Sequence, residues 1–411
     1  YLSDYGDYNA TMSAEVRFIR ALNYYYLLDE WGNVPFTTAI SSTKPPRIKR
    51  ADLYKWLVSE LKEIEQGLNE PQPKVSSTQG YGRVDKAAAW LLLARLYMNA
   101  EVYTGTADWA DAKTYAKKVI DSPYKLYTAK KGQWSAYQQL FMGDNGENGS
   151  SVEAIFPILQ DGKKTTSWGT TLFLMAGCND NKERVKSATE KGNNTTEGWA
   201  GNRMRPDLVQ KFFPNNDAPN ISAYAMPAAA DDDRALFDGD GRNVTNGDDE
   251  NGVKVFTNGF SVCKFNNFKT DGSAGHDSKF PDTDFFLMRA AEAYLMYAEA
   301  DARQNGGTTT ADGAKYINEL RSRAHATTYT AYSLRQICDE WSREFYFEGL
   351  RRTTLIRFGY FGGNINYNWS WKGGVKNGRN FDAHLNLFPI PTLITLEISS
   401  VFEVLMSGTT D

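Results

Sequence analysis

The sequence predicts a mainly α-helical protein, in which a tetratricopeptide-like scaffold of helical hairpins carries a large, loop-rich insertion with short strands. Apolar residues recur three and four apart in residues 82–102 and again in residues 284–303, as they do on one face of a helix. A short glycine-containing turn and a second periodic segment follow each of them, which predicts two similar hairpins. Between these hairpins, residues 130–281 are rich in Gly, Asn, Asp and Thr and lack helical periodicity.

Residues 13–31 and 52–68 predict the first two helices. Apolar side chains surround so much of the first helix that we expect it to be buried among other helices. Asp52 is the expected N-cap of the second helix. The apolar stripe of that helix consists of Leu53, Leu57, Leu61, Ile64 and Leu68.

Residues 82–102 and 107–120 predict the next hairpin, which turns at Gly105. Its first helix is rich in alanine, and small side chains on a packed face let a neighbouring helix approach closely. Repeated hairpins of about 34 residues are typical of tetratricopeptide stacking.

Residues 284–303 predict the central helix of the C-terminal part. Arg289 with Glu292, and Glu299 with Arg303, have the spacing of ion pairs on a helix surface. The apolar face of this helix consists of Leu287, Ala291, Tyr294, Leu295, Ala298 and Ala302.

Two more helices are expected after the Gly306-Gly307 break. Residues 314–324 predict an antiparallel return helix. Residues 333–349 begin with a Ser-x-x-Gln capping box and end at a glycine. Cys338 lies on the apolar stripe of this last helix and is the expected core thiol.

The chain therefore divides into four parts. Residues 1–129 are the N-terminal helices, 130–281 the insertion, 282–350 the C-terminal helices, and 351–411 an irregular segment that closes over the core. Loops held on rigid helices are the usual place for a binding site. We therefore expect the ligand to bind to the insertion.

Aromatic residues in polar, glycine-rich surroundings are the candidate ligand-binding side chains: Trp168, Trp199 and, between two glycines, Tyr81. A sugar ring has faces of C–H groups edged by hydroxyls, so an aromatic ring covers the face while amides or guanidinium groups bind the hydroxyls. Asn202 and Arg203 follow Trp199 and are the candidate polar partners. The alternative for each ring is that it anchors its loop against the scaffold.

Six other tryptophans are expected to stabilise the fold rather than to bind a ligand. Trp369 and Trp371 alternate around a turn and are expected to belong to the framework. Those on helical stripes, which we expect in the core, are Trp31, Trp56, Trp90 and Trp341.

Composition excludes several classes of function. The net charge is only -4 and the Lys and Arg residues are scattered, so we expect no nucleic-acid partner. The 3 cysteines are far apart without a CxxC motif, which argues against a zinc site or a disulfide framework. The 3 histidines lie in no metalloprotease motif and beside no obvious nucleophile, so we expect no enzyme.

Acidic residues leave two alternatives open. A glycoside hydrolase needs two carboxyl groups across a sugar bond, and residues 231–240 supply acids, although adjacent acids in a loop usually form a solvated or ion-binding surface. Calcium is the one cofactor considered, because Asp238, Asp240 and Asp248 offer carboxylate oxygens on glycine-rich loops. Neither loop follows the EF-hand pattern.

Six segments in a specific order carry a family resemblance: AEVRFIRALNYYYLLDEWGNVP, GRVDKAAAWLLLARLYMNAEVY, DFFLMRAAEAYLMYAEADAR, INELRSRA, EWSREFYFEGLRRTTLIRFGYF and NLFPIP. With them, most of the chain resembles the SusD/RagB family of nutrient-binding outer-membrane lipoproteins of the Bacteroidetes. The resemblance implies a tetratricopeptide-like fold, glycan capture without catalysis, and delivery to a SusC-type TonB-dependent transporter. It also implies a lipid anchor in the outer membrane, facing the cell exterior, on a cysteine preceding Tyr1.

Within the family, SWGTTLFLMAG, WAGNRMRPDLVQKFFP and YNWSWKGG are similar to the starch-binding branch, so starch or maltooligosaccharide is the expected ligand. The alternatives are a SusD-like binder of a different glycan or nutrient, a peptide-binding helical-repeat scaffold, and the glycoside hydrolase. The ending LITLEISSVFEVLMSGTTD departs from the family's usual C-terminus.

Overall fold

A computed structural model of the protein describes residues 9–180, 193–244, 255–363, 365 and 367–389. The helices of this part are α1 (Ala10–Glu30), α2 (Arg50–Ile64), α3 (Lys86–Met98), α4 (Ala100–Thr104), α5 (Trp109–Asp121), α6 (Ala136–Gln139), α7 (Thr170–Ala176), α8 (Pro206–Val209), α9 (Met226–Ala230), α10 (Ala290–Gln304), α11 (Ala311–Arg323), α12 (Leu334–Phe345) and α13 (Arg351–Arg357). The strands are β1 (Ala154–Ile158), β2 (Phe237–Asp238), β3 (Ser261–Val262) and β4 (Phe285–Arg289). None of these helices is long and apolar enough to cross a membrane.

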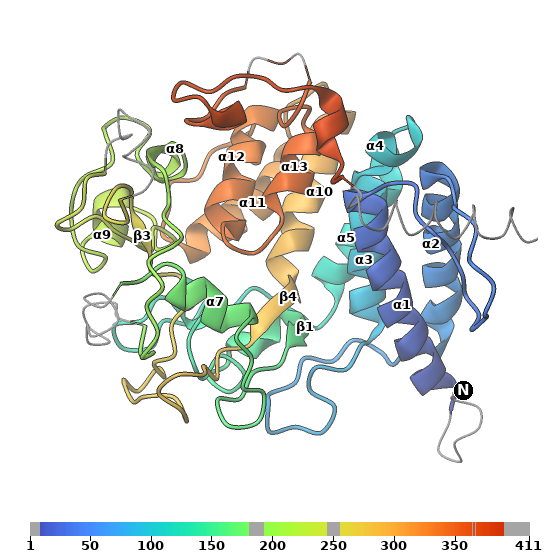
Figure 1. The fold of residues 1–411 in the computed structure, drawn as a ribbon, viewed down its shortest axis with the longest axis horizontal. Helices are drawn as coiled ribbons and strands as arrows, with labels where there is room; N and C mark the ends of the chain where they lie inside the picture. Colours follow the sequence, from blue (N-terminus) through green and yellow to red (C-terminus); the bar gives the residue numbers. More distant parts are fainter. Residues whose placement is uncertain (1–8, 181–192, 245–254, 364, 366, 390–411) are drawn as a thin grey trace, which may run out of the picture.

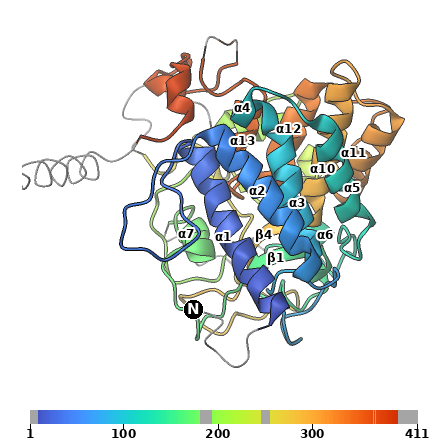
Figure 2. The ribbon, with the colours of Figure 1, turned by 90° about the vertical axis from the view of Figure 1, so that its right-hand side faces the viewer.

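The long helices form hairpins that stack side by side (Figures 1 and 2). α1 packs against α2, α3 against α5, and α10 against α11. α5 also packs against α10, which joins the hairpins into one scaffold around a continuous apolar core. Alanines on α3 and α10 are fully buried, so these two helices are enclosed by their neighbours. The predicted hairpin scaffold is confirmed.

Local sequence explains where several helices begin. Asp85 caps α3, because its carboxylate accepts a hydrogen bond of 2.9 Å from the Ala87 N–H. The predicted capping box of α12 is present, with Ser333 and Gln336 bonded to each other's backbone. The predicted cap of α2 is wrong: Lys49 occupies the N-cap position without a side-chain bond, and Asp52 lies in the first turn.

Two N-terminal helices differ from the prediction. α1 is not buried all around, because Val16 and Ile19 are 50% and 40% exposed. The segment expected as one helix over residues 82–102 is divided at Asn99 into α3 and α4. At this break the Asn99 side chain donates a hydrogen bond of 2.8 Å to the Arg95 carbonyl oxygen.

The helix expected over residues 284–303 begins only at Ala290. The preceding Phe285–Arg289 is strand β4, which pairs antiparallel with β1. Phe286 and Met288 point into the core while Leu287 is only half-buried, as alternation along a strand requires. The prediction failed because the pairing partner β1 is distant in sequence.

The insertion between α5 and β4 contains only short elements among its described residues. Its apolar side chains form small cores of their own, one of which packs against Tyr346 at the end of α12. Its short strands β2 and β3 pair antiparallel with each other. Figure 1 shows this part beside and below the helical scaffold. The exact boundaries of the four parts stay predictions.

A buried ion network joins the insertion to the scaffold. Its members are Glu153, Arg234, Lys264, Arg289, Arg323, Glu340, Glu344 and Glu348. Arg289 lies 2.8 Å from Glu153, 2.7 Å from Glu344 and 2.7 Å from Glu348. The expected pair of Arg289 with Glu292 is therefore wrong, since Arg289 belongs to β4. Glu292 instead binds Arg95 at 2.6 Å, whereas the predicted pair of Glu299 with Arg303 is confirmed.

Glu344 on α12 connects three arginines of this network. Burial alone would raise the pKa of its carboxyl group, but Arg323, Arg289 and Arg234 hold that pKa well below its usual range. Glu344 is therefore ionised, although its side chain is fully buried. A buried carboxylate of this kind depends on its partners, because an unpaired charge in the interior is strongly destabilising.

We expect Glu344→Gln to lower the free energy of unfolding by about 3 to 5 kcal/mol, because it keeps the volume but leaves buried guanidinium groups without their carboxylate. Urea denaturation measures this change. Glu101→Gln, at an exposed position of α4, is the control and should change the free energy by less than about 0.5 kcal/mol. Equal effects of the two substitutions would contradict the central role of Glu344.

Candidate functional site

Trp168 and Trp199, which were selected separately from the sequence, lie next to each other. Their ring centroids are 6.3 Å apart and their planes are inclined by 29°. Trp168 is 55% exposed and Trp199 is 39% exposed. Both rings therefore offer surface to solvent, and neither is buried against the scaffold as the alternative required.

Two phenylalanines extend this pair. The Phe280 ring meets Trp168 edge to face at 5.4 Å, and the Phe173 ring of α7 lies 6.1 Å from Trp199. Phe173 is 49% exposed. We call Trp168, Trp199, Phe173 and Phe280 the aromatic platform. Exposed rings grouped in this way are uncommon unless they serve binding.

Backbone hydrogen bonds fix the loops that carry the platform. The Trp199 N–H donates to the carbonyl oxygen of Ala176 at 2.8 Å, where α7 ends. The Thr195 hydroxyl donates to the Lys279 carbonyl oxygen at 2.9 Å, which ties the Trp199 loop to the Phe280 loop. The rings are thus held in place before a ligand arrives.

Left-handed backbone follows each tryptophan. Thr170 has a φ of 51° and Ala200 also has a φ of 51°. Non-glycine residues with positive φ are uncommon and are strained when the side chain is β-branched, as in Thr170. Such strain persists where the surrounding structure enforces it, and it clusters at functional sites.

Charged side chains border the platform. The Trp199 indole N–H donates to the Glu197 carboxylate at 3.0 Å. The Lys279 ammonium lies 5.1 Å from the centre of the Trp168 ring and 3.7 Å from Glu197. The platform therefore combines apolar ring faces with a carboxylate and an ammonium, which are able to bind hydroxyl groups.

The structure does not bring Tyr81 to the platform. Its hydroxyl donates to the Asp284 carboxylate at 2.7 Å. It lines a separate cavity of about 670 Å³, whose lining includes no platform residue. Burial, followed by the neighbouring Asp284, raises the pKa of Tyr81 well above its usual range. This geometry favours the anchoring role for Tyr81.

Asn202 and Arg203 form hydrogen bonds with backbone carbonyl groups that hold the chain after Trp199 in place. The Asn202 N–H donates to the Gly177 carbonyl oxygen. The Arg203 guanidinium donates to the carbonyl oxygens of Gly201 and Asn258, each at 3.1 Å. Burial, helped by nearby arginines, lowers the pKa of Arg203. As sugar partners, both residues stay predictions.

The acidic candidates for calcium lie only partly within the described residues. Asp238 is buried in β2 and accepts a hydrogen bond of 3.0 Å from the Asp240 N–H, while Asp248 lies outside the described residues. The ligand atoms of Asp161, His276 and Asp282 lie within 4.8 Å of one another, which makes them the described group closest to metal-binding spacing. Calcium binding stays a prediction.

Sequence reasoning missed the two phenylalanines of the platform. Phe173 is exposed on α7, whose buried residues include Leu172, Met175 and Ala176. An apolar residue on the exposed face of this short helix was the sequence signal that could have identified it. Phe280 lies in irregular chain and gave no periodic signal.

The remaining aromatic predictions agree in part with the structure. Trp341 is buried, and Trp369 and Trp371 are half-buried in the C-terminal segment. Those that lie at the rim of the core, only partly buried, are Trp31, Trp56 and Trp90.

Comparison with protein families and curated proteins gives consistent matches. The model of the SusD family matches residues 238–393. The starch-binding protein SusD of Bacteroides thetaiotaomicron is 42% identical over 410 residues, which cover 92% of this chain and 69% of that protein. A SusD-like protein of Bacteroides ovatus is 24% identical over 81% of this chain and 56% of its own length.

Solved structures match the fold. A SusD superfamily protein from Parabacteroides distasonis has a TM-score of 0.66 at 18% identity and covers 96% of this chain and 79% of its own. Surface glycan-binding protein A from Bacteroides thetaiotaomicron, in complex with laminarihexaose, has a TM-score of 0.63 at 21% identity, with coverages of 96% and 79%.

The buried carboxyl group of Asp284, which binds Tyr81, makes the free energy of unfolding depend on pH. Burial raises its pKa from 3.8 to about 6, although hydrogen bonds from Gln160 and Tyr81 oppose the rise. The native state therefore binds more protons than the unfolded chain between these two values, and the free energy of unfolding falls as the pH rises through this window. Above it, the ionised carboxylate costs on the order of 2 to 3 kcal/mol.

We expect the free energy of unfolding of Asp284→Asn, minus that of the native protein, to increase by about 2 kcal/mol between about pH 4 and about pH 7. The native protein alone loses stability as its carboxyl group ionises. The amide is neutral throughout and keeps an oxygen that accepts from Gln160. Urea denaturation at both pH values measures the difference, and Asp217→Asn, at an exposed position, is the control. A difference that does not change with pH would show that Asp284 is not the titrating group.

Proposed function

The chain belongs to the SusD family, and from this premise we propose that it is a non-catalytic glycan-binding protein whose best candidate ligand is starch or maltooligosaccharide. The supporting relative is the starch-binding protein SusD, at 42% identity. The observation in this chain that supports the proposal most directly is the pair of exposed, adjacent rings of Trp168 and Trp199.

The platform would bind a glycan by stacking. Each exposed indole covers the C–H face of one sugar residue, with a contribution of about 1 to 3 kcal/mol by analogy with base stacking. Glu197 accepts hydrogen bonds from sugar hydroxyls and Lys279 donates to them, because both lie at the edge of the rings. Because the loops are held by backbone hydrogen bonds, little ordering of the protein is needed on binding.

We extend the proposal to the cellular role that the family membership implies. In this role the protein is lipid-anchored in the outer membrane, faces the cell exterior, and delivers captured polysaccharide to a SusC-type TonB-dependent transporter. The peptide-binding scaffold is disfavoured because it leaves the exposed rings of the insertion unexplained.

The first experiment is calorimetric titration of the protein with maltoheptaose, with cello- and mannooligosaccharides in parallel. We expect heat of binding for maltoheptaose only, and we expect maltoheptaose to be recovered unchanged after prolonged incubation. Binding of another oligosaccharide in its place would support the alternative glycan. Release of shorter sugars would overturn the non-catalytic proposal in favour of a glycoside hydrolase.

We expect Trp168→Ala and Trp199→Ala each to weaken binding of the recognised oligosaccharide by about tenfold, because each removes one stacking surface. The melting temperature should change little for Trp168→Ala, since that ring is more than half exposed, at 55%. Tyr224→Ala is the matched control, because Tyr224 is an exposed ring of the insertion, 66% accessible, outside the platform. A loss of many degrees in Trp168→Ala, with unchanged affinity, would make Trp168 a structural anchor.

A further inference from the structure

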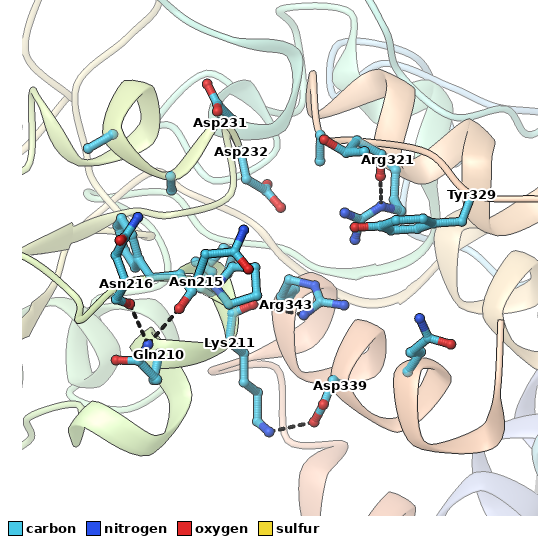
Figure 3. A pocket seen from close by; sticks show the side chains of 18 of the residues that line it. Gln210, Lys211, Asn215, Asn216, Asp231, Asp232, Arg321, Tyr329, Asp339 and Arg343 are labelled. Atoms are coloured by element: carbon cyan, nitrogen blue, oxygen red, sulfur yellow. Dashed lines mark hydrogen bonds and ion pairs between the residues drawn. The ribbon is translucent and has the colours of Figure 1, made fainter.

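A second polar cavity lies apart from the aromatic platform. Its volume is about 600 Å³, and it is bounded by the chain after α8, the turn after α9, and the connection from α11 to α12 (Figure 3). None of the platform residues lines it. In Figure 1, α8 and α9 lie well away from α7, next to which the platform is built.

An exposed ring forms one wall of this cavity. Tyr329 is 47% exposed, and Figure 3 shows its ring beside Arg321, whose guanidinium lies 5.4 Å from the ring centre. The Tyr332 ring meets it edge to face at 5.6 Å. The Asn318 side chain accepts from the Tyr329 N–H at 3.2 Å and donates to its carbonyl oxygen at 2.9 Å. The ring is therefore held in position yet open to solvent.

Amide side chains lie across the cavity from this ring. The Gln210 side-chain amide donates to the carbonyl oxygen of Asn216 at 2.6 Å, and its oxygen accepts from the Ala218 N–H at 3.2 Å, which folds the loop around it. Asn215 and Asn216 are exposed on this loop. Their side-chain amides have no hydrogen-bond partner within the described ranges of the chain, so they are available to a ligand.

The cationic side chains that line the cavity already have ion-pair partners. Lys211 binds Asp339, and both Arg321 and Arg343 bind Glu340, at 2.7 and 2.6 Å. Two lining carboxylates have no ion-pair partner in the described part of the chain: Asp207, which accepts hydrogen bonds from Ser370, and the exposed Asp231. An anionic ligand such as a phosphate would find no free cation here and would meet Asp231. A neutral ligand with many hydroxyl groups fits this lining better.

We propose that this cavity is a second saccharide-binding site, in which the Tyr329 ring stacks on a sugar residue and the amides of Asn215 and Asn216, with the carboxylate of Asp231, bind its hydroxyls. The proposal rests on the glycan-binding function proposed above. A polysaccharide that reaches both sites binds more tightly than its separate contacts suggest, because the second contact becomes intramolecular.

The test compares variants by affinity electrophoresis in gels that contain the polysaccharide of the glycan recognised in the calorimetric panel, amylopectin if that glycan is maltoheptaose. We expect Tyr329→Ala and Asn215→Ala each to weaken retardation by about threefold to tenfold, as loss of one site of a bivalent binder predicts. Asn215 is exposed on a loop, so its replacement leaves folding intact. Tyr224→Ala is the control and should bind as the native protein does.

The double variant Trp168→Ala/Trp199→Ala should keep weak retardation, and adding Tyr329→Ala should abolish it. Unchanged retardation of Tyr329→Ala and Asn215→Ala, alongside weakened Trp168→Ala, would overturn the second site and leave the proposed function standing. An equal loss in Tyr224→Ala would also overturn the second site. Absence of retardation and of heat for the native protein with every glycan tested would overturn both proposals.

Discussion

The buried ion network is the constraint on which the arrangement of this protein depends. Glu344 of α12 binds Arg289 of β4, Arg323 of α11 and Arg234 of the insertion, so one carboxylate connects three distant segments of the chain. A buried ionic group need not add net stability over an apolar alternative, but breaking its pairing is costly. A different placement of the insertion on the scaffold would separate these buried charges, and the network therefore destabilises such arrangements.

From this network, a series of contacts leads to the platform. Lys264 of the insertion, which follows β3 by two residues, binds Glu348 at 2.6 Å. Within β3, the Ser261 hydroxyl donates at 2.6 Å to the carbonyl oxygen of Cys178, just after α7. The end of α7 in turn accepts the Trp199 N–H. Loops that carry little regular structure are thus tied to the rigid helices, which explains how an irregular insertion is able to hold exposed rings in fixed positions.

The parts of the fold that sequence predicted are those decided locally. Helical periodicity, the Ser333 capping box and the pair of Glu299 with Arg303 all involve residues a few positions apart. The larger errors involve distant partners: β4 looked helical because its partner β1 lies more than a hundred residues away, and Arg289 was paired within a helix that it does not belong to. The Asp52 cap was a local error, because α2 begins earlier than predicted, at Arg50. At the site, the polar local sequence predicted Trp168 and Trp199 as separate candidates. Their contact could not be predicted, because it depends on the tertiary structure.

The 29° inclination between the two indole planes sets a shape requirement on whatever lies across them. Two coplanar rings would support a flat, ribbon-like chain, in which successive sugar rings lie near one plane. Inclined rings instead follow a chain that turns from one residue to the next, as a helical α-glucan does. If a glycan stacks on both rings as proposed, a straight chain that rests fully on one ring lifts away from its neighbour, so the angle favours a curved chain before any hydroxyl group is bound.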